Sequence, residues 1–119
     1  MNTEKLKELI KHREEVERIS HGEWADEIEK CQKHLTELLV EDMKSTIAYI
    51  SDECTSNEYI WISEVLDDII ELAPNKDFLR SFSGLKAKYP DEYSSYHIEE
   101  SIQSAESILN YEVQDEKKD

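Results

Sequence analysis

Apolar residues recur along most of this chain at the three- and four-residue spacing of an α-helix, and the longest such pattern runs from Thr55 to Ala73. On a helix its apolar side chains cover about half of the circumference, which is more than one neighbouring helix can bury. Thr55 and Glu58 have the spacing of a capping box at its start, and Pro74 disfavours helix beyond Ala73. We therefore predict a central helix that packs against two neighbours. Its apolar positions are Tyr59, Trp61, Ile62, Val65, Leu66, Ile69, Ile70, Leu72 and Ala73.

The chain before this segment predicts two or three further helices. The first runs from Thr3 to about His21, with Gly22 in the left-handed position that ends it. The second begins near residue 23, and its helical period continues to residue 53. One long helix and a break near Asp42 both fit this pattern, and the break is favoured because helices longer than about 25 residues are uncommon in compact domains. The inward positions of these patterns are Leu6, Leu9, Ile10, Val16, Ile19, Trp24, Ile28, Cys31, Leu35, Leu38 and Leu39.

The chain after the central helix predicts a short helix, a loop and a last helix. Asn75 can cap the short helix, and Pro90 stops it. Residues 91–96 are predicted to be a tyrosine-bearing loop. The last helix begins near residue 98, and residues 113–119 are expected to form a frayed tail.

Together these patterns predict an all-α fold: a single domain of residues 1–112, built from five to six antiparallel helices in a helical bundle or a short α-solenoid-like array. Two glycines and two prolines leave little material for the hairpins of an all-β fold. No repeated sequence identifies a known solenoid. A chain of 119 residues is long enough for one hydrophobic core and too short for two.

Acidic residues outnumber basic ones by 29 to 14, and the formal net charge is −15. A polyanion would be repelled, so we expect a basic protein as partner and neither nucleic acid nor an anionic membrane. The acidic excess is uneven, since residues 45–119 hold 17 acids and 6 bases whereas residues 1–44 hold 12 and 8. No Lys or Arg occurs between Ser45 and Asn75. Four acids of the central helix have the spacing of one exposed face: Glu64, Asp67, Asp68 and Glu71.

The sequence contains none of the motifs that identify common catalytic or cofactor sites, such as a Gly-rich phosphate loop, HExxH, Gly-x-Ser-x-Gly or a calcium loop. The four histidines lack the mutual spacing of metal ligands. Cys31 and Cys54 are isolated and fit buried apolar positions, although a disulfide between them stays open. We therefore expect no catalytic residue, no cofactor and no metal site. No signal-peptide pattern follows Met1 and no apolar run approaches the ~20 residues of a membrane span, so the expected location is the cytoplasm.

The segment from Asp42 to Leu109 resembles small acidic helical immunity proteins of bacterial toxin–immunity pairs, including those of contact-dependent growth inhibition. The resemblance rests on three stretches, WISEVLDDIIE, AKYPDEY and YHIEESIQSAESIL. It implies a stoichiometric cytoplasmic inhibitor that neutralises a cognate toxin, commonly a nuclease. Such proteins share no fixed inhibitory residue, so the resemblance assigns no site.

The candidate partner-binding residues therefore come from charge and from the tyrosines. An acidic helix face flanked by aromatic residues can imitate phosphates and can approach a basic active site rapidly. The alternative is a non-catalytic adaptor or regulatory domain that binds another basic protein or peptide. In both hypotheses a monomer is favoured. The candidates are Glu64, Asp67, Asp68, Glu71, Tyr89, Asp91, Glu92, Tyr93, Tyr96, Glu99 and Glu100.

Overall fold

Eight α-helices and one 3-10 helix make up most of residues 1–117, which are the residues that the computed structural model describes, with side chains to residue 111. Helix accounts for 84% of the described residues, which form one compact globule without a strand. The predicted all-α class is confirmed, and the predicted number of five to six helices is wrong. In order, the elements are α1 (Thr3–Ser20), α2 (Ala25–Glu41), α3 (Met43–Asp52), α4 (Ser56–Glu64), α5 (Leu66–Leu72), α6 (Lys76–Gly84), η1 (Leu85–Ala87), α7 (Pro90–Ser95) and α8 (Ile98–Lys117).

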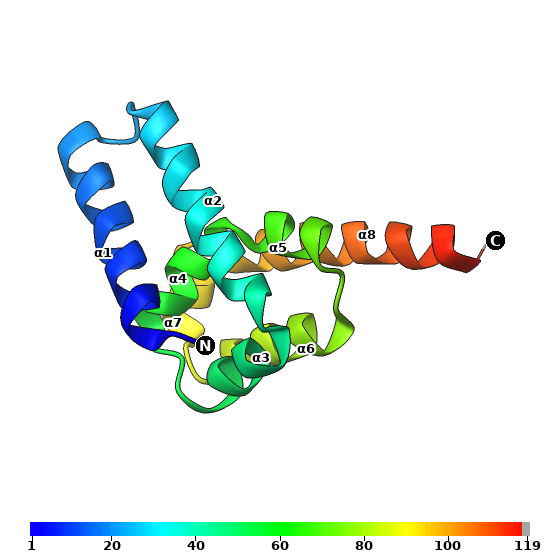
Figure 1. Cartoon of the computed structure of the whole chain (residues 1–119). Helices are drawn as coiled ribbons and strands as arrows, with labels where there is room; N and C mark the ends of the chain where they lie inside the picture. The colour runs from blue at the N-terminus through cyan, green and yellow to red at the C-terminus, as the bar shows by residue number, and fades with distance from the viewer. Residues whose placement is uncertain (118–119) are drawn as a thin grey trace.

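The helices are arranged as a hairpin and a body. Helices α1 and α2 pack side by side, and the turn that joins them projects away from the other helices (Figure 1). In the body, α8 contacts α4, α5, α6 and α7, while α3 packs against α6. Helix α2 of the hairpin contacts both α3 and α5 of the body, and α1 reaches α4 through the ion pairs Lys7–Glu58 and Arg13–Glu64. The C-terminal part of α8 extends beyond the other helices (Figure 1).

The predicted central helix is interrupted at Val65. Its start is as expected, because Thr55 and Glu58 form a complete capping box. At Val65 the backbone leaves the helical region (φ −109°, ψ 11°), and its N–H donates to the carbonyl of Ile62 at 3.0 Å. The bend separates α4 from α5 and lets both helices pack against α8. The helical period is continuous in the sequence and predicts one helix, but packing against α8 favours two shorter helices.

Two other predictions of element boundaries have opposite outcomes. The favoured break near Asp42 is confirmed, because Asp42 lies between α2 and α3 and its side chain accepts a hydrogen bond from Ser45 N at 3.3 Å. The predicted loop at residues 91–96 is wrong, because most of it belongs to α7. Pro90 occupies the first turn of α7 and does not only end the preceding helix. Its fixed φ suits that position, where its missing N–H costs nothing.

The core lies in the body and in the inner half of the hairpin. Three residues that the pattern placed inside are exposed instead: Ile19 by 58%, Trp24 by 50% and Leu72 by 61%. Ile19 and Trp24 lie at the outer end of the hairpin, beyond the reach of the body. The largest fully buried side chains are Tyr59, Phe78, Phe82, Leu6, Leu39, Ile50, Ile62, Leu66, Ile69, Ile70, Ile98 and Val16.

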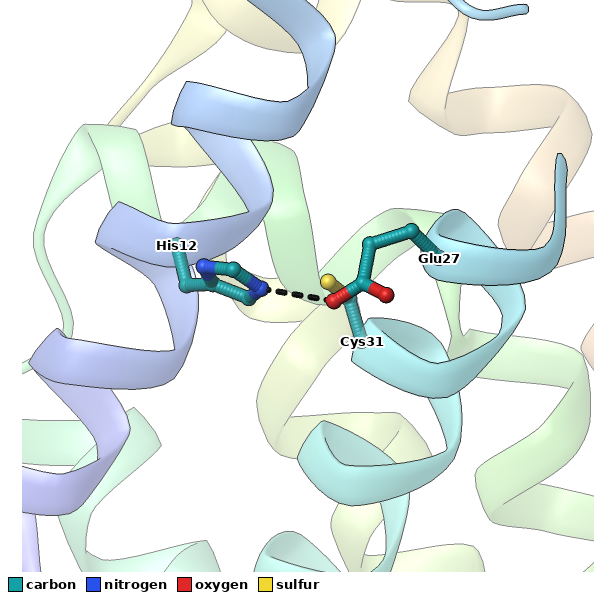
Figure 2. Close-up of side chains that lie close together, drawn as sticks. All are labelled: His12, Glu27 and Cys31. Atoms are coloured by element: carbon teal, nitrogen blue, oxygen red, sulfur yellow. Dashed lines mark hydrogen bonds and ion pairs between the residues drawn. The ribbon is translucent and has the colours of Figure 1, made fainter. Parts of the chain in front are cut away.

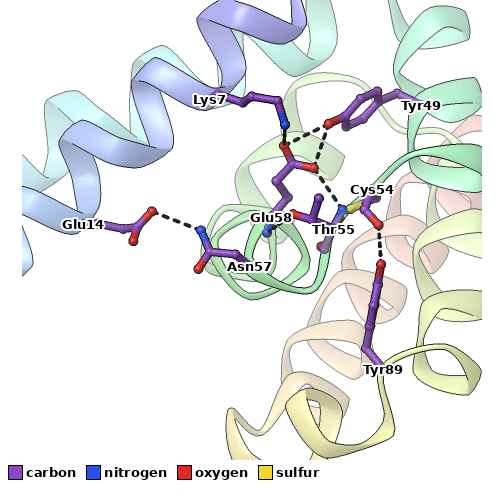
Figure 3. Close-up of polar contacts among 8 residues, drawn as sticks. All are labelled: Lys7, Glu14, Tyr49, Cys54, Thr55, Asn57, Glu58 and Tyr89. Carbon is purple, nitrogen blue, oxygen red and sulfur yellow. Dashed lines mark hydrogen bonds and ion pairs between the residues drawn. The ribbon is translucent and has the colours of Figure 1, made fainter.

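A buried carboxylate joins the hairpin to the body. Glu58 is 3% exposed, and it accepts hydrogen bonds from the Tyr49 hydroxyl at 2.7 and 2.9 Å and from the Thr55 N–H at 3.0 Å (Figure 3). Lys7 of α1 adds an ion pair at 3.3 Å. Burial and the neighbouring carboxylate raise the pKa of Tyr49, so its hydroxyl stays a donor. A buried charge that keeps this many partners stabilises one arrangement of α1, α3 and α4.

The predicted frayed tail, residues 113–119, lies entirely outside the part of the chain whose side chains are described. The backbone of α8 is helical to Lys117, and residues 118–119 lie outside the described residues altogether. That prediction therefore stays a prediction. Within residues 1–117, no helix combines the length and the apolar run that crossing a membrane would need.

Candidate protein-binding surface

Glu64, the first of the four acids predicted to share one face of the central helix, forms an ion pair with α1. Arg13 holds both carboxylate oxygens of Glu64, with Nη2 at 2.6 Å from Oε1 and Nε at 3.0 Å from Oε2. The same guanidinium contacts Glu17 at 3.1 Å and lies 5.0 Å from the ring centre of Trp61. Although burial opposes a charged guanidinium, the two carboxylates raise the pKa of Arg13. Glu64 therefore has a basic partner already, which a segment without Lys or Arg did not suggest.

Asp67 is directed toward α8. Its Oδ2 accepts a hydrogen bond from Ser104 Oγ at 2.8 Å, and its Oδ1 is buried without a partner among the described residues. Of the four acids predicted to share one exposed face, Glu64, Asp68 and Glu71 are exposed, whereas Asp67 is half-buried against α8. The bend at Val65 directs Glu64 toward α1 and leaves Asp68 and Glu71 as the exposed pair on α5.

Asp68 and Glu71 line a groove between α2 and α5, which we call the acidic groove. It encloses about 780 Å³. Helix α2 contributes two more carboxylates and one ammonium group, and Lys33 lies 4.0 Å from Glu37. Exposed Leu72 adds an apolar surface beside the charges. The lining residues are Glu29, Gln32, Lys33, Thr36, Glu37, Asp68, Glu71 and Leu72.

The chemistry of the acidic groove suits a basic side chain of another protein. Four carboxylates against one lysine leave a net negative field that attracts cations and accelerates their approach. Arg and Lys carry an apolar stem below the charged head, and Leu72 offers an apolar contact for such a stem. The sequence pattern predicted the contribution of α5. It could not identify the α2 residues, because their proximity to α5 depends on how the two helices pack.

The candidate residues around α7 form a different surface. Tyr89 serves the interior, since its hydroxyl donates to the Cys54 carbonyl at 2.6 Å and its ring lies 5.9 Å from that of Tyr59. Tyr93 is half-buried against the core, whereas Tyr96 is 56% exposed. The second surface therefore retains one exposed aromatic residue.

The acids beside these tyrosines also differ from one another. Asp91, Glu99 and Glu100 are exposed, whereas Glu92 is half-buried with Oε2 lacking a partner among the described residues. Helix α7 packs against α4, η1 and α8, and none of its residues lines the acidic groove. The predicted site is thus divided into the acidic groove and a second acidic surface near Tyr96.

A larger groove lies between the start of α1 and the end of α2. It encloses about 1120 Å³ and is lined by Met1, Asn2, Lys5, Leu9, His34, Glu37, Leu38, Val40, Glu41 and Asp42. Here Lys5 and His34 accompany three carboxylates, so the balance of charge is weaker than in the acidic groove. Glu37 contributes to both grooves.

One cluster of side chains in the described residues could hold a metal ion. His12 of α1 faces Glu27 and Cys31 of α2, and their ligand atoms lie within 4.8 Å of one another (Figure 2). Our search of the sequence missed it, because we compared the histidines with each other and the three residues come from two helices. The only signal within one helix is the four-residue separation of Glu27 and Cys31.

Comparison with known proteins gives no match: no protein-family model, no curated protein and no solved structure matches the chain.

Proposed function

We propose that the chain is a non-catalytic inhibitor of the immunity-protein type, which binds a basic toxin domain such as a nuclease through the acidic groove. The observation that supports this most is the groove itself, where Glu29, Glu37, Asp68 and Glu71 surround exposed Leu72 with a single lysine among them. The overall charge of −15 supports it as well, since it repels nucleic acid and attracts a basic protein.

The physical basis of inhibition is competition for a positive site. A nuclease must present Lys and Arg to a polyanionic substrate, and each phosphate contact contributes to affinity. Carboxylates of the acidic groove can occupy those basic side chains and exclude substrate. Long-range attraction raises the association rate and makes it sensitive to salt.

The test is reversal of charge in the groove. Asp68→Lys combined with Glu71→Lys places two positive charges where the partner's basic residues would bind. The matched control is Asp52→Lys combined with Glu53→Lys, because these exposed acids at the end of α3 lie outside both acidic surfaces. Both variants change the net charge equally, so a difference between them reports on the position of the charges.

The measurement first asks whether a gene next to this one encodes a toxic domain, and then follows the growth of cells that express that domain together with wild type or one of the two variants. We expect wild type and the control to protect, and the groove variant to bind at least about a hundredfold more weakly and to fail. If wild type gives no protection, the inhibitor proposal is wrong, and an adaptor for another basic protein becomes the better hypothesis.

If the groove variant protects as well as the control, the acidic groove is not the binding surface, although the inhibitor proposal itself still stands. In that case the second acidic surface is tested next, with Asp91→Lys and Glu99→Lys, because both residues are exposed near Tyr96. Circular dichroism of every variant confirms that a loss of protection does not come from unfolding.

A further inference from the structure

His12, Glu27 and Cys31 converge between the two helices of the hairpin. His12 projects from α1, while Glu27 and Cys31 lie one turn apart on α2 (Figure 2). His12 Nε2 lies 2.9 Å from Glu27 Oε1, and the thiol sulfur completes a triangle in which every separation is below 4.8 Å. The side chain of His12 is 55% exposed and that of Glu27 is 23% exposed, so solvent reaches the cluster from one side. Cys31 is 5% exposed and forms the inner wall.

We propose that this cluster is a zinc site, with His12, Glu27 and Cys31 as three ligands and water as the fourth. An imidazole nitrogen, a carboxylate oxygen and a thiolate sulfur form a donor set that Zn²⁺ accepts in tetrahedral geometry. Ligand atoms on one tetrahedral zinc lie roughly 3.3–3.8 Å apart, given bonds of about 2.0–2.3 Å. A separation as wide as 4.8 Å therefore has to shorten by about 1.0 to 1.5 Å. Rotation of the His12 and Glu27 side chains can supply this shift, because both reach solvent and neither belongs to the hydrophobic core.

Protons compete with the metal at this cluster. Burial raises the pKa of the Cys31 thiol, and the Glu27 carboxylate adds to the effect, while Arg13 opposes it. The bound ion reverses that balance, because a thiolate and a neutral imidazole are the forms that coordinate. Binding therefore releases the thiol proton to solvent, and affinity increases as the pH is raised through neutrality.

A bound metal ion would join α1 to α2 in the outer part of the hairpin, where few apolar contacts hold the two helices together. Cys31 is buried, yet it lies outside the main hydrophobic cluster, whose members in the hairpin are Leu6, Ile10, Leu35, Leu38 and Leu39. A metal ion that binds only the folded hairpin stabilises it by mass action. This inference does not depend on the proposed partner of the acidic groove.

The test uses Co²⁺ as a spectroscopic substitute for Zn²⁺, with the reduced, metal-free full chain. Wild type should bind one equivalent at micromolar metal, with a thiolate-to-cobalt charge-transfer band and the visible bands of tetrahedral cobalt. Zn²⁺ should abolish both by displacement. Zn²⁺ at a hundredfold excess over its dissociation constant should raise the Tm by about 5 °C or more.

Two pairs of variants isolate the ligands. Cys31→Ala should remove the charge-transfer band, whereas Cys54→Ala should keep it. His12→Ala should weaken binding at least about tenfold, whereas His34→Ala should not. His34 is the matched control for His12, since both are exposed histidines on the hairpin. Exposure of both side chains makes folding of these two variants secure, and circular dichroism checks it.

Three results would overturn the zinc site. The first is a wild-type protein with no saturable cobalt spectrum below millimolar metal. The second is a charge-transfer band that survives Cys31→Ala, because the sulfur ligand would then lie elsewhere. The third is equal affinity in His12→Ala and His34→Ala.

Discussion

The outer half of the hairpin and the body are held together by different forces. In the outer half, polar contacts dominate: Arg13 with Glu17 and Glu64, and His12 with Glu27. Among residues 12–31, only Arg13, Val16 and Cys31 are buried. The body instead contains most of the fully buried apolar side chains, from Tyr59 in α4 to Ile98 in α8.

This difference predicts unequal local stability. Burial of apolar surface contributes roughly 25 cal/mol per Å², so a body rich in buried Ile, Leu and Phe opens only with global unfolding. An ion pair that remains partly in contact with water contributes less, because desolvation offsets the attraction between its charges. The outer hairpin should therefore open separately and at lower free energy. It is also where the proposed metal ion would have most effect.

The largest effect is expected from a charge placed in the body. Ile69 is 0% exposed, so Ile69→Asp buries an unpaired carboxylate and should cost more than about 5 kcal/mol, enough to unfold the chain. Ile19 is 58% exposed in the outer hairpin, and Ile19→Asp should cost less than about 1 kcal/mol. Thermal melts followed by circular dichroism measure both. A folded Ile69→Asp protein with native Tm would mean that this face of α5 is not buried.

A smaller and localised effect is expected at Arg13. Arg13→Met keeps the apolar stem but leaves Glu64 and Glu17 without their partner, which should cost about 2 kcal/mol. Hydrogen exchange should show faster exchange in residues 12–31 and unchanged exchange in α5 and α8. The control is Arg18→Met, which removes an exposed ion pair with Glu15 and should leave the free energy of unfolding almost unchanged. Equal loss of protection across the whole chain would contradict the separate opening of the hairpin.

Alkaline pH should lower the free energy of unfolding more through a buried group of the body than through groups of the hairpin. Burial raises the pKa of Cys54 from its ordinary value of 9.0 to about 12, with Glu58 as the next contributor. Its contribution to stability is complete below pH 9.0, where the thiol is neutral in both states, and is lost as the pH rises toward 12. From pH 9 to about 10, urea unfolding should show wild type losing about 1 kcal/mol more than Cys54→Ala. Identical pH profiles would mean that the thiol is not buried in solution.

The smallest change in stability is expected at Leu72, an apolar residue of the body that is exposed to solvent. Leu72 belongs to α5 but is 61% exposed in the acidic groove, so Leu72→Ser should change the free energy of unfolding by less than about 0.5 kcal/mol. Leu66 of the same helix is 0% exposed and serves as the contrast, since Leu66→Ala should cost about 3 kcal/mol. Chemical denaturation measures the free energy of unfolding of both variants. If the two lose similar amounts, Leu72 is not exposed in solution.

Local chemistry was sufficient to predict the helical class, the capping box at Thr55 and the break at Asp42. A helical period needs only neighbouring residues, and a capping side chain bonds to an N–H three residues away. Even so, α7 was missed although Pro90 is a local signal, because proline both ends one helix and begins another. The exposure of Ile19 and Trp24 could not be predicted from the helical period. The period identifies the apolar face of a helix, but it does not show whether another helix covers that face.

By itself, then, the sequence determined the all-helical class, most of the helical segments, and the excess of acidic charge in the C-terminal two-thirds. Tertiary structure alone decided how those charges are used. It bent the central helix at Val65, paired Glu64 with Arg13 from 51 positions earlier, and placed Asp68 opposite α2. It also brought His12 to Glu27 and Cys31. Each of these contacts joins residues of different helices, and packing of buried side chains, which no local spacing records, selects such contacts.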